Sequence, residues 1–159
     1  MQDTDPTQAT VEAYDVPLDR MFTYRLARLH ALLNAQAIRI LKERAGISLA
    51  EWRVLAALAT RGEVPAAEII RLTDVDKSQL SRNIKKMVER GLITSHLDAS
   101  NQRTLAKTDR GRALFQELSP LMRQRQDYLM NCLTDAEQDA LFEAFDRLED
   151  RARRLEEQI

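Results

Sequence analysis

Helical periodicity runs through most of this 159-residue chain, and strict alternation of apolar and polar residues occurs at only one place. Apolar residues recur every three or four positions from Leu18 to Leu41, and again after Ser48 and after Thr134. The alternating residues, 92–97 and 104–107, flank a polar stretch at 98–103 and predict one β-hairpin. The chain is therefore expected to be mainly α with a small β-hairpin.

Capping residues, Pro and Gly give the expected limits of the helices. Residue types that favour the N-cap precede four apolar patterns, at Ser48, Asp76, Thr108 and Thr134. Together with Pro65 as a helix start and Gly46 and Gly91 as stops, they place helices at 18–45, 49–60, 65–72, 77–90, 109–131 and from 135 onward. The inward faces around the centre of the chain are expected to include Trp52, Val54, Leu55, Leu58, Ile69, Ile70, Leu72, Leu80, Ile84, Met87 and Val88.

The net charge of −1 hides an uneven distribution of charge along the chain. Residues 76–112 hold nine Lys or Arg against four Asp or Glu, whereas the rest of the chain is acidic. Such a block suggests a surface for a polyanion, although a solvated charged helix would have the same composition. One cysteine, no apolar run of membrane-spanning length and no secretory signal at the N-terminus predict a cytoplasmic protein.

A turn at Thr73–Val75 separates the short helix from the polar-faced helix, which is the order of a helix-turn-helix. The hairpin directly after the second helix predicts a winged helix-turn-helix, which places one helix in the major groove of DNA. The outward face of this helix offers hydrogen-bond donors and no carboxylate from Lys77 to Lys86.

Five residues of the polar helix have the chemistry to read bases in the major groove. Arg82 suits a bidentate contact to guanine, and Gln79 and Asn83 suit adenine. Ser78 and Ser81 could reach a phosphate or a base edge.

Four further residues are expected to position the protein on the DNA backbone or in the minor groove. Lys77, Lys85 and Lys86 suit phosphate contacts, which fix position without reading sequence. Arg103, at the hairpin tip, suits a narrow minor groove, where negative potential is concentrated.

In order and spacing, segments of this chain resemble the MarR family of winged helix-turn-helix regulators of bacteria and archaea. The segments are Ser48–Leu58, Asp76–Ile84, Glu89–Ile93, Asp98–Arg103 and Thr108–Gly111. The resemblance covers about residues 20–155, with a departure at Lys107, where Leu is common. The resemblance implies an obligate homodimer in which the first and last helices are intertwined. It also implies that the dimer binds pseudo-palindromic operators and is released from DNA when a small, often aromatic, acid binds.

The resemblance divides the chain into three parts. Residues 1–17 form a flexible N-terminal arm, residues 46–108 the winged helix-turn-helix lobe that binds DNA, and residues 18–45 with 109–159 a helical dimerisation region. The apolar positions of the last helix step by four and three residues as in a heptad seam, which independently supports a dimer: Leu141, Phe145, Leu148, Ala152 and Leu155.

Candidate effector-binding residues lie on the first two helices, where the ligand pockets of this family form. They are Tyr24, Arg25, His30 and Trp52. The partner of Arg25 could be an effector carboxylate or an acidic side chain of the second subunit. For Trp52, a place in the core beside Leu55 is the favoured interpretation, and a ligand contact is the second.

No catalytic residue, metal site or cofactor is expected from the sequence. Motifs of nucleophile elbows, P-loops, dinucleotide folds and paired histidines are missing, and Cys132 is interpreted as a plain thiol. The expected function is a homodimeric, sequence-specific DNA-binding repressor released by a small effector. The alternative is a helical dimeric adaptor that keeps the winged-helix shape but binds protein, although its surface would more often expose aromatic residues.

Overall fold

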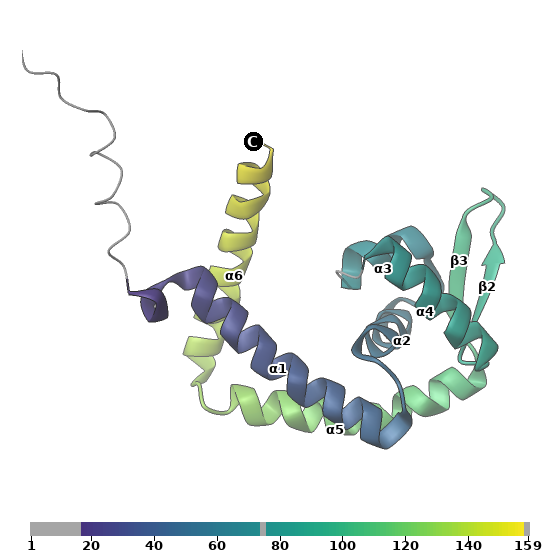
Figure 1. Ribbon diagram of the computed structural model, residues 1–159, viewed down its shortest axis with the longest axis horizontal. Coiled ribbons are helices and arrows are strands. Elements are labelled where there is room, and N and C mark those ends of the chain that lie inside the picture. The colour runs from purple at the N-terminus through teal and green to yellow at the C-terminus, as the bar shows by residue number, and fades with distance from the viewer. Residues whose placement is uncertain (1–16, 74–75, 158–159) are drawn as a thin grey trace, which may run out of the picture.

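The computed structural model of the protein describes residues 17–73 and 76–157. In chain order the elements are η3 Leu18–Arg20, α1 Phe22–Ala45, α2 Leu49–Arg61, β1 Val64–Pro65, α3 Ala66–Thr73, α4 Lys77–Glu89, β2 Ile93–Leu97, β3 Arg103–Lys107, α5 Asp109–Met130 and α6 Asp135–Glu156 (Figure 1). The mainly helical fold with a small hairpin is confirmed. The arm expected at 1–17 falls outside the described residues apart from Pro17, as do Asp74 and Val75 of the expected turn.

The first helix is shorter than predicted, because its N-terminal part is a separate 3-10 turn. Met21 adopts an extended conformation, with φ −71° and ψ 124°, and interrupts the helical hydrogen bonding between η3 and α1. The predicted end at Gly46 is confirmed, since this residue has a left-handed φ of 60°. Such a φ costs glycine little, because it carries no Cβ.

Each predicted N-cap is present in the structure. Ser48 and Thr134 both form complete capping boxes with the glutamate three residues later. Asp76 and Thr108 accept backbone N–H groups from the first turns of α4 and α5. Local sequence therefore sets where these helices begin, because each cap satisfies N–H groups that the helix leaves unpaired.

The sheet has a third strand that the sequence analysis missed. Val64 and Pro65, expected to precede and open a helix, form β1, which pairs antiparallel with β3 in the order β1-β3-β2. Val64 lies opposite Leu105, and Pro65 lies opposite Thr104. Two residues are too few to show an alternating pattern. An edge strand also tolerates proline, which has no N–H to donate.

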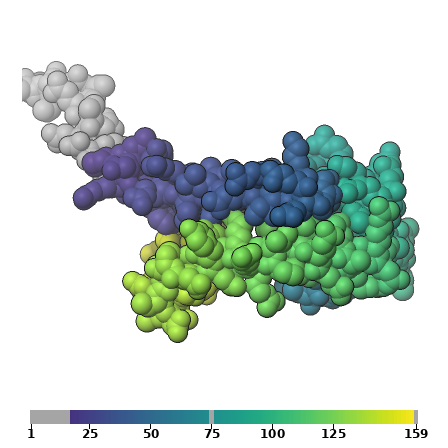
Figure 2. Space-filling model, turned by 90° about the horizontal axis from the view of Figure 1, so that it is seen from below, coloured from purple at the N-terminus to yellow at the C-terminus, as the bar shows by residue number. Residues whose placement is uncertain are grey.

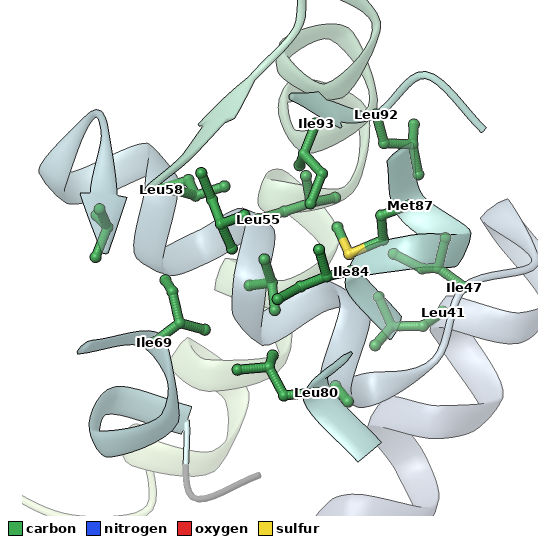
Figure 3. Packing of buried hydrophobic residues seen from close by; sticks show 14 of the residues in the cluster. Leu41, Ile47, Leu55, Leu58, Ile69, Leu80, Ile84, Met87, Leu92 and Ile93 are labelled. Atoms are coloured by element: carbon green, nitrogen blue, oxygen red, sulfur yellow. The ribbon is translucent and has the colours of Figure 1, made fainter. Parts of the chain in front are cut away.

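In the part of the chain that the structure describes, one apolar core lies between α2, α3, α4, the sheet and the nearby ends of α1 and α5 (Figure 3). Leu55, Ile69, Met87 and Leu105 are completely buried in it. The prediction that Leu72 and Val88 lie in the core is wrong, since Leu72 is 41% exposed and Val88 is 40% exposed. Helices α3 and α4 each bury a narrower stripe than the apolar residues of the sequence suggested, because the lobe covers only one side of each helix.

Helices α1 and α5 lie side by side and antiparallel, and they carry the lobe at one end (Figures 1 and 2). At the other end α6 leaves α5 at a steep angle, on the same side of α1 and α5 as the lobe but apart from it (Figure 1), and none of its residues is buried. Among the described residues, no helix is long and apolar enough to cross a membrane.

Candidate nucleic-acid interface and ligand pocket

The N-terminus of α4 is held by Asp76. Its Oδ1 accepts the N–H groups of Ser78 at 2.8 Å and Gln79 at 3.1 Å, and also the hydroxyl of Ser78. The hydrogen bond from the Ser78 side chain, followed by those from the two N–H groups, lowers the pKa of Asp76 below its ordinary value of 3.8. The cap therefore stays ionised near neutral pH and fixes where the polar helix begins.

The solvent face of α4 carries most of the predicted DNA-contacting residues. Those that are exposed are Lys77, Ser78, Gln79, Ser81, Arg82, Lys85 and Lys86. Asn83 does not share this exposure: it is half-buried, and its Nδ2 is buried without a hydrogen-bond partner among the described residues. This burial conflicts with the outward placement that the sequence predicts for Asn83.

Two of the exposed residues have side-chain partners outside α4, whereas Lys85 lies 4.0 Å from Glu89 of α4 itself. Ser78 donates its hydroxyl to the Asp76 cap. Lys86 Nζ lies 3.7 Å from Oε1 of Glu51, whose side chain is completely buried. Lys77, Gln79, Ser81, Arg82 and Lys85 therefore make up the part of this face that points most directly to solvent.

Arg90 and Glu51 hold the C-terminal end of α4 against the helices behind it. Arg90 donates to the carbonyl groups of Ala45 and Gly46, both at 3.3 Å, and lies 3.6 Å from Glu51 Oε1. Glu51 Oε2 in turn accepts the N–H of Ser48 at 2.6 Å. The cluster joins the ends of α1, α2 and α4, so Arg90, counted in the basic block, is a structural residue here.

The hairpin β2–β3 lies beside α4 in the lobe (Figure 1). Its tip is closed by Asp98, whose Oδ1 accepts the N–H groups of Ser100 at 2.8 Å and Gln102 at 2.9 Å. These bonds lower the pKa of Asp98, and the one from the Gln102 N–H has the larger effect. Arg103, expected at the tip, is instead the first residue of β3, and it is exposed opposite Leu97.

Gly111 allows α5 to approach the base of this hairpin. A Cβ at this position would lie 2.0 Å from the carbonyl oxygen of Leu92. Thr108 completes the junction by donating its hydroxyl to the Gly91 carbonyl at 2.6 Å and accepting the Gly111 N–H at 3.0 Å. The hairpin is thus fixed to the long helix that leads away from the lobe.

A pocket of about 690 Å³ opens between α1, α2 and α3 on another side of the lobe. It is lined by His30, Trp52, Arg53, Ala56, Ala57, Thr60, Arg61, Leu72 and Thr73. Two of the four predicted effector residues, His30 and Trp52, meet in it. Tyr24 is not among the lining residues, and Arg25 lines a different groove between α1 and α6.

Two arginines that the sequence analysis did not select supply positive charge to this pocket. Arg53 Nη1 donates to the carbonyl oxygen of Thr73 at 3.2 Å, and Arg61 Nη1 lies 2.5 Å from Glu68 Oε1 on α3. Both sit on α2 among apolar residues, but only the packing of α3 against α2 shows that they share a cavity. Arginine and an aromatic ring together suit a small aromatic anion.

Trp52 contacts both the pocket and the core. Its ring stacks on that of Phe115, with centroids 5.2 Å apart and planes 11° from parallel. Nζ of Lys107, at the end of β3, lies 4.8 Å from the Phe115 centroid. Burial, together with the charge of Arg112, lowers the pKa of Lys107. A single tryptophan thus borders both the cavity and the packing at the base of the hairpin.

Sequence comparison assigns the lobe to a known family. A model of the MarR family matches residues 45–104, which include α2, α3, α4 and the hairpin up to the start of β3. The sequence has no significant match among curated proteins.

Solved structures of regulators match almost the whole chain. A MarR/EmrR family transcriptional regulator from Acinetobacter sp. ADP1 gives a TM-score of 0.81 at 23% identity, covering 87% of this chain and 99% of that chain. A MarR family transcriptional regulator from Silicibacter pomeroyi gives 0.75 at 26% identity, covering 83% and 90%. BpsR of Bordetella bronchiseptica, whose DNA binding is regulated by 6-hydroxynicotinic acid, gives 0.75 at 20% identity, covering 85% and 97%.

Proposed function

This chain belongs to the MarR family of winged helix-turn-helix regulators, and on that premise we propose that it is a homodimeric, sequence-specific DNA-binding repressor of the cytoplasm. The observation that carries the proposal is the solvent face of α4. From Lys77 to Lys86 this face offers hydrogen-bond donors and positive charge without a carboxylate, beside an exposed hairpin. A face of this kind suits base edges and phosphates, whereas a protein-binding face would more often expose aromatic residues.

In this proposal α4 enters the major groove, and its residues divide into two groups. Arg82, Gln79 and Ser81 read base edges, and Lys77 and Lys85 contact phosphates. Ser78 and Lys86 have smaller roles, because their polar atoms also serve the Asp76 cap and Glu51. The role of Asn83 at an adenine requires a change of its side-chain rotamer on binding.

The proposed homodimer forms through the helical region at 18–45 and 109–159. Large apolar side chains remain exposed along α1 and α6: Phe22, Leu26, Leu29, Leu32, Phe142, Leu148 and Leu155. A second copy of the chain would cover this surface, as intertwined first and last helices do in a dimer of this family. Two α4 helices would then read half-sites about 34–36 Å apart.

The proposed effector is a small aromatic acid that binds in the pocket between α1, α2 and α3 and releases the protein from DNA. Trp52 offers a flat aromatic surface there, and Arg53 offers donors for a carboxylate, whereas the guanidinium of Arg61 is paired with Glu68. The regulation of BpsR by 6-hydroxynicotinic acid is a precedent for this chemistry on the same fold.

The test is a selection of genomic DNA fragments by the purified full chain at roughly 0.15 M salt, where non-specific phosphate binding is already weak. We expect recovery of an inverted repeat with a footprint of two half-sites, and higher expression of the adjacent gene when the protein is absent. A folded dimer that recovers no fragment above background would contradict the proposal. That result would favour a winged-helix adaptor that binds protein.

A further inference from the structure

We propose that Arg53 is the residue through which a carboxylate in the pocket loosens the helix-turn-helix. The guanidinium that faces the pocket also donates a hydrogen bond to the C-terminal end of α3. A ligand carboxylate that binds this guanidinium therefore releases the end of α3. The inference rests on the proposed function for its consequence at DNA. The replacement of the Thr73 carbonyl by a ligand carboxylate as the partner of Arg53 can be tested without DNA.

Arg53 stabilises the end of α3 by satisfying a carbonyl group that the helix leaves unpaired. Its Nη1 donates to the backbone oxygen of Thr73, the last residue of α3, at 3.2 Å. Thr73 is only 5% exposed, and its hydroxyl donates to the Ile69 carbonyl at 2.6 Å. A positive charge at this position also complements the negative end of the helix dipole.

The end of α3 is the element that positions the start of the DNA-reading helix. Asp76, the cap of α4, follows Thr73 after only two residues. A displacement of Thr73 therefore reaches the cap through a very short connection. Since Asp76 fixes the first turn of α4, the position of Arg82 on DNA depends on where α3 ends.

A carboxylate in the pocket competes directly for this guanidinium. Arg53 and Thr73 both line the cavity, so a bound anion lies beside the existing hydrogen bond. The charged guanidinium makes one hydrogen bond to the Thr73 carbonyl, whereas it binds a carboxylate through two parallel bonds in which both partners are charged. The backbone carbonyl of Thr73 is a neutral, single acceptor and is the weaker partner.

Arg61 provides a matched control within the same pocket. It lies on the same helix and lines the same cavity, but its guanidinium is already 2.5 Å from the carboxylate of Glu68. Its removal takes away one positive charge, as removal of Arg53 does, without freeing the carbonyl of Thr73. The two substitutions therefore separate the helix-capping role from the general charge of the pocket.

The first experiment is amide hydrogen exchange on the full chain without ligand or DNA. We expect Arg53→Gln to raise exchange of the Leu72 and Thr73 amides at least fivefold. Arg61→Gln should leave these two amides within twofold of the wild type. Equal exchange in the two variants would overturn the role of Arg53 at the end of α3.

The second experiment adds benzoate, salicylate or 6-hydroxynicotinate and follows the emission of Trp52, the single tryptophan, which lines the pocket. Benzamide is the uncharged control of the same size. We expect at least one acid to change the emission of the wild type and of Arg61→Gln, with at least tenfold weaker binding to Arg53→Gln. The acid that binds should also raise exchange of the Leu72 and Thr73 amides in the wild type.

The outcomes distinguish this inference from the proposed function. An acid that binds but leaves hydrogen exchange at the end of α3 unchanged would overturn the proposal that the ligand replaces the Thr73 carbonyl as the partner of Arg53. So would the absence of an emission change with all three acids. If the acid both binds and loosens α3, but the protein selects no DNA, the role of Arg53 stands and the proposed function fails.

Discussion

Arg82 lies at the centre of the exposed face of α4 and is the side chain with the most specific expected contact. A bidentate bond to guanine would discriminate against other bases by about 1–3 kcal/mol. We expect Arg82→Ala to weaken operator binding by that amount and to relax the preference at one base step. Binding measured against a set of single-base operator variants checks this expectation, and an unchanged base preference would contradict it.

Lys85→Ala is the matched control on the same helix. This residue is exposed, and within the described part of the chain its one ion pair is a 4.0 Å contact with Glu89. As a phosphate contact it should weaken all sequences about equally and flatten the dependence of binding on salt. Lys86 is a poorer control because it lies beside the buried Glu51, so its removal also disturbs the folded lobe.

Gly111 is required by the close approach of α5 to the backbone of Leu92. An added Cβ would lie 2.0 Å from the Leu92 carbonyl oxygen, and backbone atoms cannot move as easily as a side chain can. We expect Gly111→Ala to lower the free energy of unfolding by about 1–3 kcal/mol. Urea unfolding measures this loss, and Ala113→Gly, two residues along on the exposed side of the same helix, tests for a general effect of helix propensity.

At the scale of elements, the cap of α4 predicts how stability depends on pH. Hydrogen bonds, first from the Ser78 hydroxyl, place the pKa of Asp76 below its ordinary value of 3.8 in the folded state. Because the pKa is lower in the folded state than in the unfolded state, the ionised carboxylate stabilises the protein fully above about pH 4. This contribution to the free energy of unfolding is lost as the pH falls through the folded-state pKa.

Asp76→Asn isolates this contribution, because asparagine is an equally good cap but does not ionise. We expect nearly unchanged stability at pH 7 and a shallower loss of stability below pH 4. Asp98 and Glu137 keep their own lowered pKa values, so some acid sensitivity will remain. Urea unfolding of both proteins at pH 7 and pH 3 is the measurement, and identical acid sensitivity would contradict the assignment.

At the scale of the whole molecule, the exposed apolar surface of α1 and α6 predicts association. Leu148 is 43% exposed and borders a groove with Phe22 and Leu26 of α1. A charge placed there would be buried without a partner in a dimer, which is costly. We expect Leu148→Asp to produce monomers at micromolar concentration in sedimentation experiments, and to lose tight operator binding.

Arg147→Gln is the charge-matched control, since it changes the net charge by the same amount without placing a charge on the apolar seam. It should remain dimeric. Removal of residues 135–159 should likewise abolish the dimer. A truncated protein that sediments without detectable monomer would contradict the proposed role of α6.

The sequence alone determined the features that depend on near neighbours along the chain. The caps at Ser48, Asp76 and Thr134 and the stop at Gly46 were predictable because each satisfies backbone groups within a few residues. The polar face of α4 was predictable because helical periodicity separates Arg82 from Leu80 and Ile84. These local rules also set the order of elements, and hence the winged helix-turn-helix.

Only the tertiary structure decided which distant residues meet. Val64 and Pro65 became a strand because β3 lies beside them, and Arg90 became a structural residue because the end of α1 lies within reach. The pocket joins Arg53 to the end of α3, twenty residues away in sequence. No local pattern encodes such contacts, because they depend on how helices pack against one another rather than on the preferences of any single segment.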